Sequence, residues 1–203
     1  MIKLALVALG VVVVVVLIVV VAGARAPLRH VSRTTVVLDH DPHDVWSVVS
    51  DIGAWPSWNA NVKAAHRLAD RGAHPVWEID SGGHTLPSEI LEASADERGG
   101  RLVTRIADEK LPFGGTWTWE IAPPDGDLSP GPSARAAARV SITEDGVIKS
   151  VVFRGVARLF LGYTRTQRAY LTALAERFGC RDPRFEQSVT FPRSNGAGAS
   201  ARR

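Results

Sequence analysis

The segment from residue 39 to residue 58 constrains the fold most, because it ends one element and starts another within a few residues. Asp41 stands where a helix cap is needed, Pro42 follows at the first helical position, and Asp44 falls in the first turn. A capping acid, a proline and a second acid in this order are typical of a helix start. A Thr- and Val-rich run over 31–38 precedes them, so the sequence predicts a strand that leads into a short helix.

Beyond this helix the chain reads as a series of strands followed by one long helix. The expected strands cover residues 62–68, 75–80, 85–92, 101–106, 113–121 and 135–143. After Asp145-Gly146 the apolar spacing becomes helical and stays so to residue 179. Because no helices alternate with the strands, the pattern predicts an α+β fold with an antiparallel sheet.

Several motifs occur in an order known from one family. They are Asp41-Pro42 with Val45-Trp46, then Trp-Pro-Ser-Trp at 55–58, Leu-Pro-Phe-Gly-Gly-Thr-Trp-Thr-Trp at 111–119 and Ser-Ile-Thr-Glu-Asp-Gly at 141–146. With the long C-terminal helix they resemble START-like (SRPBCC, polyketide cyclase/dehydrase) domains over about residues 31–179. The resemblance implies a helix-grip fold, in which an antiparallel sheet curves around the C-terminal helix. It also implies a hydrophobic ligand such as a lipid, isoprenoid or polyketide. Some members of the family are cyclases or hydrolases, and many only carry a ligand.

Residues 1–27 are predicted to form a transmembrane anchor and a short linker. Leu4 to Ala22 carry no charge, and 15 of these 19 residues are Val, Leu or Ile. A helix of this length spans about 28 Å, close to the hydrocarbon thickness of a bilayer. A cleaved signal peptide is the alternative, because Ala-x-Ala occurs at 22–24 and 24–26.

The charges that flank this segment predict its orientation. Lys3 precedes the segment, whereas Arg25, Arg29 and Arg33 follow it. The positive-inside rule therefore places the domain on the cytoplasmic side, with the outer face as the alternative.

Residues 28–180 are predicted to form the START-like domain, and residues 181–203 a disordered basic tail. The 28–180 segment has 17 Lys and Arg against 19 Asp and Glu, so the basic excess lies outside it. This balance argues against a nucleic-acid partner, which needs a basic patch on the folded part. Cys180 is the only cysteine, which excludes an intramolecular disulfide, and nothing in the sequence indicates an oligomeric state.

Alternation along two predicted strands indicates which side chains face a ligand. Over 113–121 the odd positions are apolar and the even ones mostly polar, which predicts one dry face. Gly115 and alanines at 134, 136 and 138 supply small side chains that leave room for a cavity. The predicted pocket residues, from these strands and from the apolar stripe of the C-terminal helix, are Trp77, Ile79, Trp117, Trp119, Glu144, Val156, Phe160 and Tyr163.

Two other classes of function stay open. A polyketide cyclase-like or hydratase-like enzyme would use Glu144, His84 or Tyr163 as polar participants. An interaction module would have a solid aromatic core and bind its partner outside. His40 and His43 straddle the start of the predicted helix, so we predict no metal site, and no motif indicates a cofactor.

Overall fold

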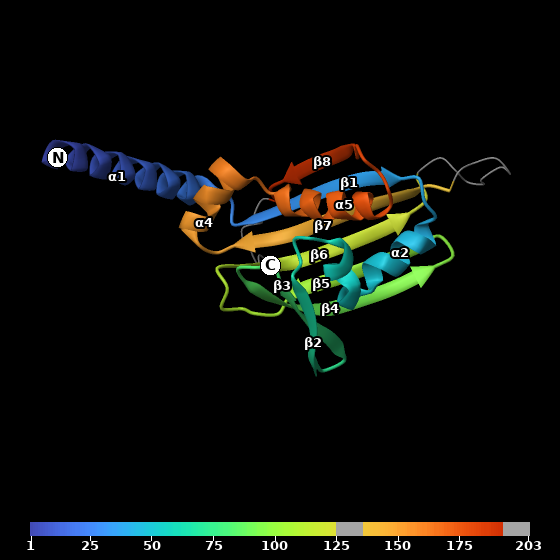
Figure 1. Ribbon diagram of the computed structural model, residues 1–203. Coiled ribbons are helices and arrows are strands. Elements are labelled where there is room, and N and C mark those ends of the chain that lie inside the picture. The colour runs from blue at the N-terminus through green and yellow to red at the C-terminus, as the bar shows by residue number, and fades with distance from the viewer. Residues whose placement is uncertain (125–135, 193–203) are drawn as a thin grey trace, which may run out of the picture.

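The computed structural model describes residues 1–124 and 136–192 (Figure 1). Its antiparallel strands form one curved sheet in the order β2-β3-β4-β5-β6-β7-β1-β8. The strands are β1 (Arg29–Leu38), β2 (Ala64–Arg71), β3 (His74–Asp80), β4 (Thr85–Asp96), β5 (Gly99–Ile106), β6 (Phe113–Ala122), β7 (Ala138–Ile148) and β8 (Phe185–Thr190). This arrangement confirms the predicted α+β fold with an antiparallel START-like sheet.

The helices include the one predicted at Asp41. They are α1 (Ile2–Arg25), α2 (Pro42–Ser50), the 3-10 turn η1 (Ile52–Ala54), α3 (Trp55–Trp58), α4 (Val151–Val156), the π-helical turn η2 (Ala157–Leu161) and α5 (Arg165–Arg177). The Asp41 carboxylate accepts a hydrogen bond from the backbone N–H of His43 at 2.8 Å, and Pro42 opens α2. The capping prediction is therefore confirmed.

The core lies between one face of the sheet and the helices α2 and α5, which both cover that face (Figure 1). Val45 and Val49 from α2 and Leu171 and Leu174 from α5 are fully buried against it. At the centre, Trp119 of β6 packs with other aromatic rings of the core.

Helix α1 extends away from the sheet and contacts the domain through α4 (Figure 1). Its 24 residues are long and apolar enough to cross a membrane, judged by length and composition, as a signal sequence would also be. Almost all of its side chains are exposed, and within it only Val19 and Gly23 are buried.

The predicted single long helix after Gly146 is wrong. Strand β7 continues to Ile148, and α4 begins only at Val151, where the Ser150 side chain accepts from the backbone of Phe153. After the π-helical turn, Gly162 has φ 70°, a left-handed conformation that glycine adopts without strain and that ends the helix. Two short helical pieces and α5 thus replace one straight helix.

The predicted disorder of the tail is also wrong for residues 185–190. These residues form β8, which pairs antiparallel with β1 from Val31↔Thr190 to Val36↔Phe185. Without β8, β1 would be an edge strand with unpaired backbone groups. The predicted tail residues 193–203, and Ala134 of the alanine row, lie outside the described residues, and Ala138 is buried in the core.

Candidate functional site

A cavity of about 430 Å³ lies between the concave face of the sheet and the segment from α4 to the start of α5. Its apolar wall is formed by Trp55, Ile79, Leu86, Ile106, Phe113, Trp117, Trp119, Val147, Ile148, Phe153, Ala157 and Leu161. Its polar lining is formed by His30, Ser88, Thr104, His84, Glu144, Tyr163 and Thr166. A mostly apolar cavity of this size with few polar groups is typical of small-molecule sites.

Five of the predicted pocket residues line this cavity, and their role in binding stays a prediction. They are Ile79, Trp117, Trp119, Glu144 and Tyr163. The alternation of β3 and β6 puts the first three on the concave face, as expected. Trp117 also packs edge-on against Tyr170 of α5, with ring centroids 5.5 Å apart, so one ring serves both core and cavity.

The other three predicted residues lie outside the cavity lining. The Trp77 ring covers Gly53 of η1, where it helps to close the core instead. Val156 is half-buried in α4, and Phe160 is 66% exposed. The π-helical turn and the break at Gly162 change the angular phase of the helix, so a straight-helix projection misplaces both side chains.

His30 is the main site residue that sequence reasoning missed. Its ring is buried, its Nε2 lies 3.4 Å from Glu144 Oε1, and its centroid lies 4.5 Å from the Tyr163 ring. Strand pairing sets His30 opposite Gly146, where any side chain would overlap the imidazole. The alternation of β1, whose buried face begins at His30 and continues through Ser32, offered the signal; the predicted strand began two residues too late.

The polar cluster of His30, Glu144 and Tyr163 forms one corner of the cavity. Burial raises the pKa of the Tyr163 hydroxyl, so this group stays a neutral donor and acceptor over the physiological range. The carboxylate of Glu144 accepts hydrogen bonds, and the imidazole can donate or accept. The corner can therefore bind a hydroxyl, carbonyl or carboxyl group, or transfer a proton.

A buried hydrogen-bond network joins this corner to α5. Gln167 Oε1 accepts from Thr34 Oγ1 at 2.7 Å, and its Nε2 donates to Ser32 Oγ at 2.8 Å and to the Ser32 carbonyl at 3.2 Å. Ser32 Oγ in turn donates to the carbonyl of Tyr163 at 3.1 Å. The network fixes the chain at Tyr163, where the cavity wall passes from η2 to α5.

The indole N–H of Trp119 has no acceptor within the part of the chain that the structure describes, and this atom is buried. Trp119 is fully buried and contributes to the cavity wall. A buried donor without an acceptor costs free energy on the order of 1–3 kcal/mol. A ligand acceptor within reach would remove this cost.

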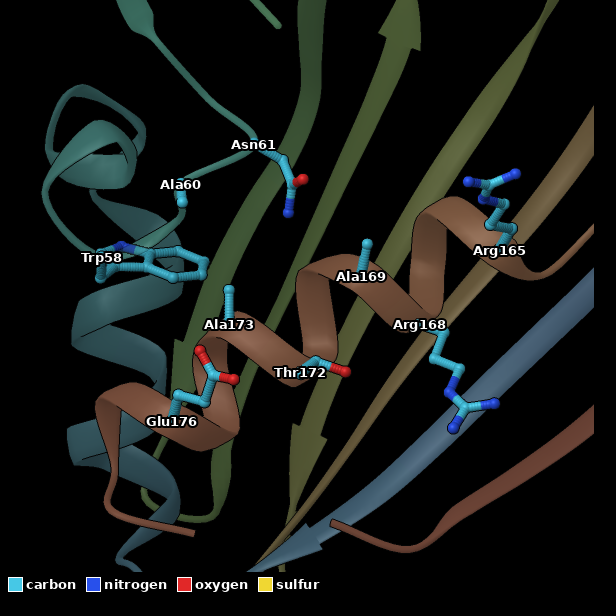
Figure 2. Close-up of a pocket in the computed structure, with 9 residues that line it drawn as sticks. All are labelled: Trp58, Ala60, Asn61, Arg165, Arg168, Ala169, Thr172, Ala173 and Glu176. Carbon is cyan, nitrogen blue, oxygen red and sulfur yellow. The ribbon is translucent and has the colours of Figure 1, made fainter. Parts of the chain in front are cut away.

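A second hollow lies on the other side of α5 (Figure 2). Trp58, Ala60 and Asn61 line one side of it, and α5 forms the other. Arg168 lines this hollow, and its guanidinium carbon lies 5.2 Å from the centroid of the Phe185 ring. The charged side chains that line this hollow, Arg165, Arg168 and Glu176, do not converge on one point. The cavity between the sheet and the segment from α4 to α5 is therefore the better candidate site.

Within residues 1–124 and 136–192, no group of three or more His, Cys, Asp or Glu side chains is placed to hold a metal ion. His40 Nε2 instead makes a hydrogen bond to the carbonyl of Phe178 at 3.0 Å. His84, named above as a possible polar participant, does line the cavity.

A sequence model of the family described as "Polyketide cyclase / dehydrase and lipid transport" matches residues 29–179. The chain belongs to this family. The resemblance inferred from the motifs is thereby confirmed, and the matched residues contain β1 through α5, including the whole cavity. Comparison with curated proteins found no match.

Several solved structures share this fold. A START superfamily protein from Mycobacterium smegmatis is 17% identical, with TM-score 0.51, over 74% of this chain and 97% of that one. A norcoclaurine synthase from Thalictrum flavum is 12% identical, with TM-score 0.54, over 75% and 96%. The di-domain aromatase/cyclase StfQ is 16% identical, with TM-score 0.54, over 75% of this chain and 52% of its own. At these identities the likeness shows the fold alone.

Proposed function

We propose that this chain is a membrane-anchored START-like domain that binds one hydrophobic small molecule, such as a lipid, isoprenoid or polyketide-like compound. The observation that carries the proposal is the cavity of about 430 Å³, whose walls are mostly apolar and whose polar side chains gather at one corner. Each methylene group moved from water into such a site contributes about 0.8 kcal/mol. A chain of ten methylenes would gain about 8 kcal/mol before the costs of association.

The polar corner defines the expected orientation of the ligand. His30, Glu144 and Tyr163 offer donors and acceptors beside an otherwise apolar wall. A hydroxyl or carbonyl group would hydrogen-bond there, while the hydrocarbon part lies along Trp117 and Ile79. The ligand class is therefore amphipathic, with one polar end.

The anchor belongs to the same proposal. Helix α1 would span the bilayer, with Arg25, Arg29 and Arg33 on the cytoplasmic side together with the domain. Apolar ligands partition from water into bilayers, so the anchor would hold the domain next to the phase that contains its ligand.

An enzyme of the cyclase or dehydratase type is the second candidate. The observation that favours it is the approach of His30 Nε2 to Glu144 Oε1 at 3.4 Å inside the cavity, a pairing that suits proton transfer. Glu144→Gln separates the two functions. Turnover by the wild type that is lost in Glu144→Gln with unchanged binding supports catalysis, whereas a wild-type chain that binds a polyketide substrate and turns over none supports a carrier.

The binding proposal is tested by solvent extraction and mass spectrometry of the full chain purified in a mild detergent. We expect one apolar compound per chain, and its loss in Trp117→Ala and Tyr163→Ala. Trp46→Ala is the matched control, because Trp46 packs on Gly100 at the core's edge and lies outside the cavity. An empty wild-type chain that also takes up nothing from lipid or polyketide mixtures would contradict the proposal.

A further inference from the structure

Residues 151–161, which comprise α4 and the π-helical turn, carry an exposed apolar surface that the cavity does not explain. Large side chains here are between 43% and 66% exposed: Val152, Phe153, Leu159, Phe160 and Leu161. We call this segment the apolar lobe. Contiguous exposed hydrophobic surface on a folded domain is typical of a contact with a partner or with lipid.

The lobe packs directly on α1. Gly155 lies against the carbonyl of Val19, and Gly23 lies against the carbonyl of Val151, so closely that a Cβ on either glycine would overlap the other backbone. Close approach through glycines is the way helices associate in membranes. The two glycines thus fix the lobe to the last two turns of α1.

Arg154 strengthens this junction. Its Nε donates to the carbonyl of Gly23 at 3.0 Å, and its Nη1 donates to the carbonyls of Ile148 at 2.8 Å and Lys149 at 2.9 Å. A cation at the C-terminal end of a helix donates to the free carbonyls there and interacts favourably with the helix dipole. One side chain therefore connects the end of α1, the end of β7 and the lobe.

This contact sets the depth of the lobe. Val19 belongs to the uncharged run Leu4 to Ala22, whose final turns must lie at the edge of the hydrocarbon if α1 spans the bilayer. Because Gly155 touches Val19, the lobe lies at that same level. Its exposed apolar side chains would meet lipid there, while the exposed Arg158 reaches the headgroups.

The lobe is also part of the cavity wall. Phe153 and Leu161 line the cavity, yet 50% and 47% of their surfaces are exposed. A single layer of side chains thus separates the cavity from the surface that faces the membrane. The left-handed Gly162 ends this layer before α5 begins.

We propose that the apolar lobe inserts into the interfacial layer of the bilayer and is the opening through which an apolar ligand passes between membrane and cavity. This inference rests on the proposed function, because it requires both the anchor and a cavity ligand. Its occupant is the lipid bilayer, argued from the fixed contact with α1. A ligand that takes this route never enters bulk water.

Insertion is tested with the full chain in lipid vesicles. A Cys180→Ser background carries Phe160→Cys labelled with an environment-sensitive fluorophore, and Glu176→Cys on the exposed side of α5 is the matched control. We expect blue-shifted emission at 160, quenched by lipids with a nitroxide near the headgroup, and water-like emission at 176. Water-like emission at both sites in vesicle-bound protein would overturn the lobe proposal alone. Failure of the chain to float with vesicles would overturn the anchor and the lobe proposal together.

Passage is tested by the rate of uptake of a pyrene-labelled fatty alcohol, followed by energy transfer from tryptophan. Phe160→Asp should slow uptake from vesicles at least tenfold and leave binding of the detergent-dispersed probe unchanged, since Phe160 lies outside the cavity lining. Val37→Asp, at an exposed apolar position of β1, is the matched control and should change neither. An unchanged vesicle rate in Phe160→Asp, with binding intact, would overturn the proposed route. Absence of probe binding in every variant and in the wild type would instead overturn the proposed function.

Discussion

Gln167 offers the sharpest test of how the sheet and α5 together shape the cavity. The side chain is fully buried and makes three hydrogen bonds to Thr34 and Ser32 on β1. Gln167→Leu replaces the amide with an apolar side chain that fills much of the same space, and it removes every one of these bonds. The Thr34 hydroxyl and the Ser32 carbonyl then lose this partner inside the core.

The expected cost follows from the groups left without a partner. Each buried polar group that loses its hydrogen bond costs about 1–3 kcal/mol. The Ser32 hydroxyl still donates to the Tyr163 carbonyl, so only the Thr34 hydroxyl and the Ser32 carbonyl are counted. The sum is about 2–6 kcal/mol. At about 2–4 °C per kcal/mol for a domain of this size, we expect a Tm decrease of about 4–24 °C.

The assay is thermal unfolding of the full chain in detergent, monitored by tryptophan fluorescence. Gln187→Leu on the exposed strand β8 is the matched control and should shift Tm by less than 2 °C. The double variant Gln167→Leu with Thr34→Val should lose less than the sum of the single losses, because it removes both partners of one bond. A Tm decrease below 2 °C in Gln167→Leu, or strict additivity in the double variant, would refute this reasoning.

Three further predictions concern single residues elsewhere in the sheet and core. The hydrogen bonds from Arg105 hold the pKa of Glu89 below its ordinary 4.5, so the stabilisation they give is complete above pH 4.5 and is lost as the pH falls through the lower pKa of the folded state. In acid titrations, the Tm of Glu89→Gln should therefore vary less with pH than that of the wild type. Burial raises the pKa of Tyr170 to about 12, so between pH 10 and pH 12 this tyrosine ionises in the unfolded chain but not in the folded one, and stability should fall over that range. Tyr170→Phe should remove this part of the loss in alkaline unfolding curves. Gly115→Ala should cost more than about 1 kcal/mol in denaturant titrations, because Gly115 has φ 142° and a Cβ there would overlap the Asp145 carbonyl, whereas Gly114→Ala meets no atom and should cost less.

Much of the fold follows from local chemistry. Asp41 and Pro42 predicted the start of α2, and turn residues predicted the strands from β2 to β6 within a few residues. The alternation of β6 put Trp117 and Trp119 on the concave face, where the structure has them. These signals are reliable because capping and strand alternation depend on near neighbours in sequence.

The errors arise where distant contacts decide. Helical spacing continues through Gly162, and only the packing of the lobe on α1 and of α5 on β1 shows why the chain turns there. Strand β8 carries the mostly polar sequence Phe-Glu-Gln-Ser-Val-Thr, which gives little strand signal of its own, and its pairing with β1 stabilises it. Gly115 lines the cavity, as expected, but sequence alone did not show that its φ of 142° and the close backbone of β7 also require glycine there.

Only part of the site was predicted, again because some of its contacts join residues that are distant in sequence. The apolar wall follows from alternation, but the pairing of His30 with Glu144 joins residues 114 positions apart and depends on the register of β1 with β7. No local pattern brings those two side chains together. Phe160 shows the converse, because an apolar residue of correct helical spacing faces outward after the helix changes its phase.

The most direct test of the central claim is photo-crosslinking of the full chain in lipid nanodiscs that contain a long-chain fatty alcohol with a diazirine group. After illumination, labelled residues are mapped by digestion and mass spectrometry. Strand β6 lies inside the domain and lines the cavity, so we predict label on Phe113 or Trp117, and its competition by the compound extracted from the purified protein. Label confined to α1 and the outer surface, with none on β6, would contradict a hydrophobic ligand in this cavity.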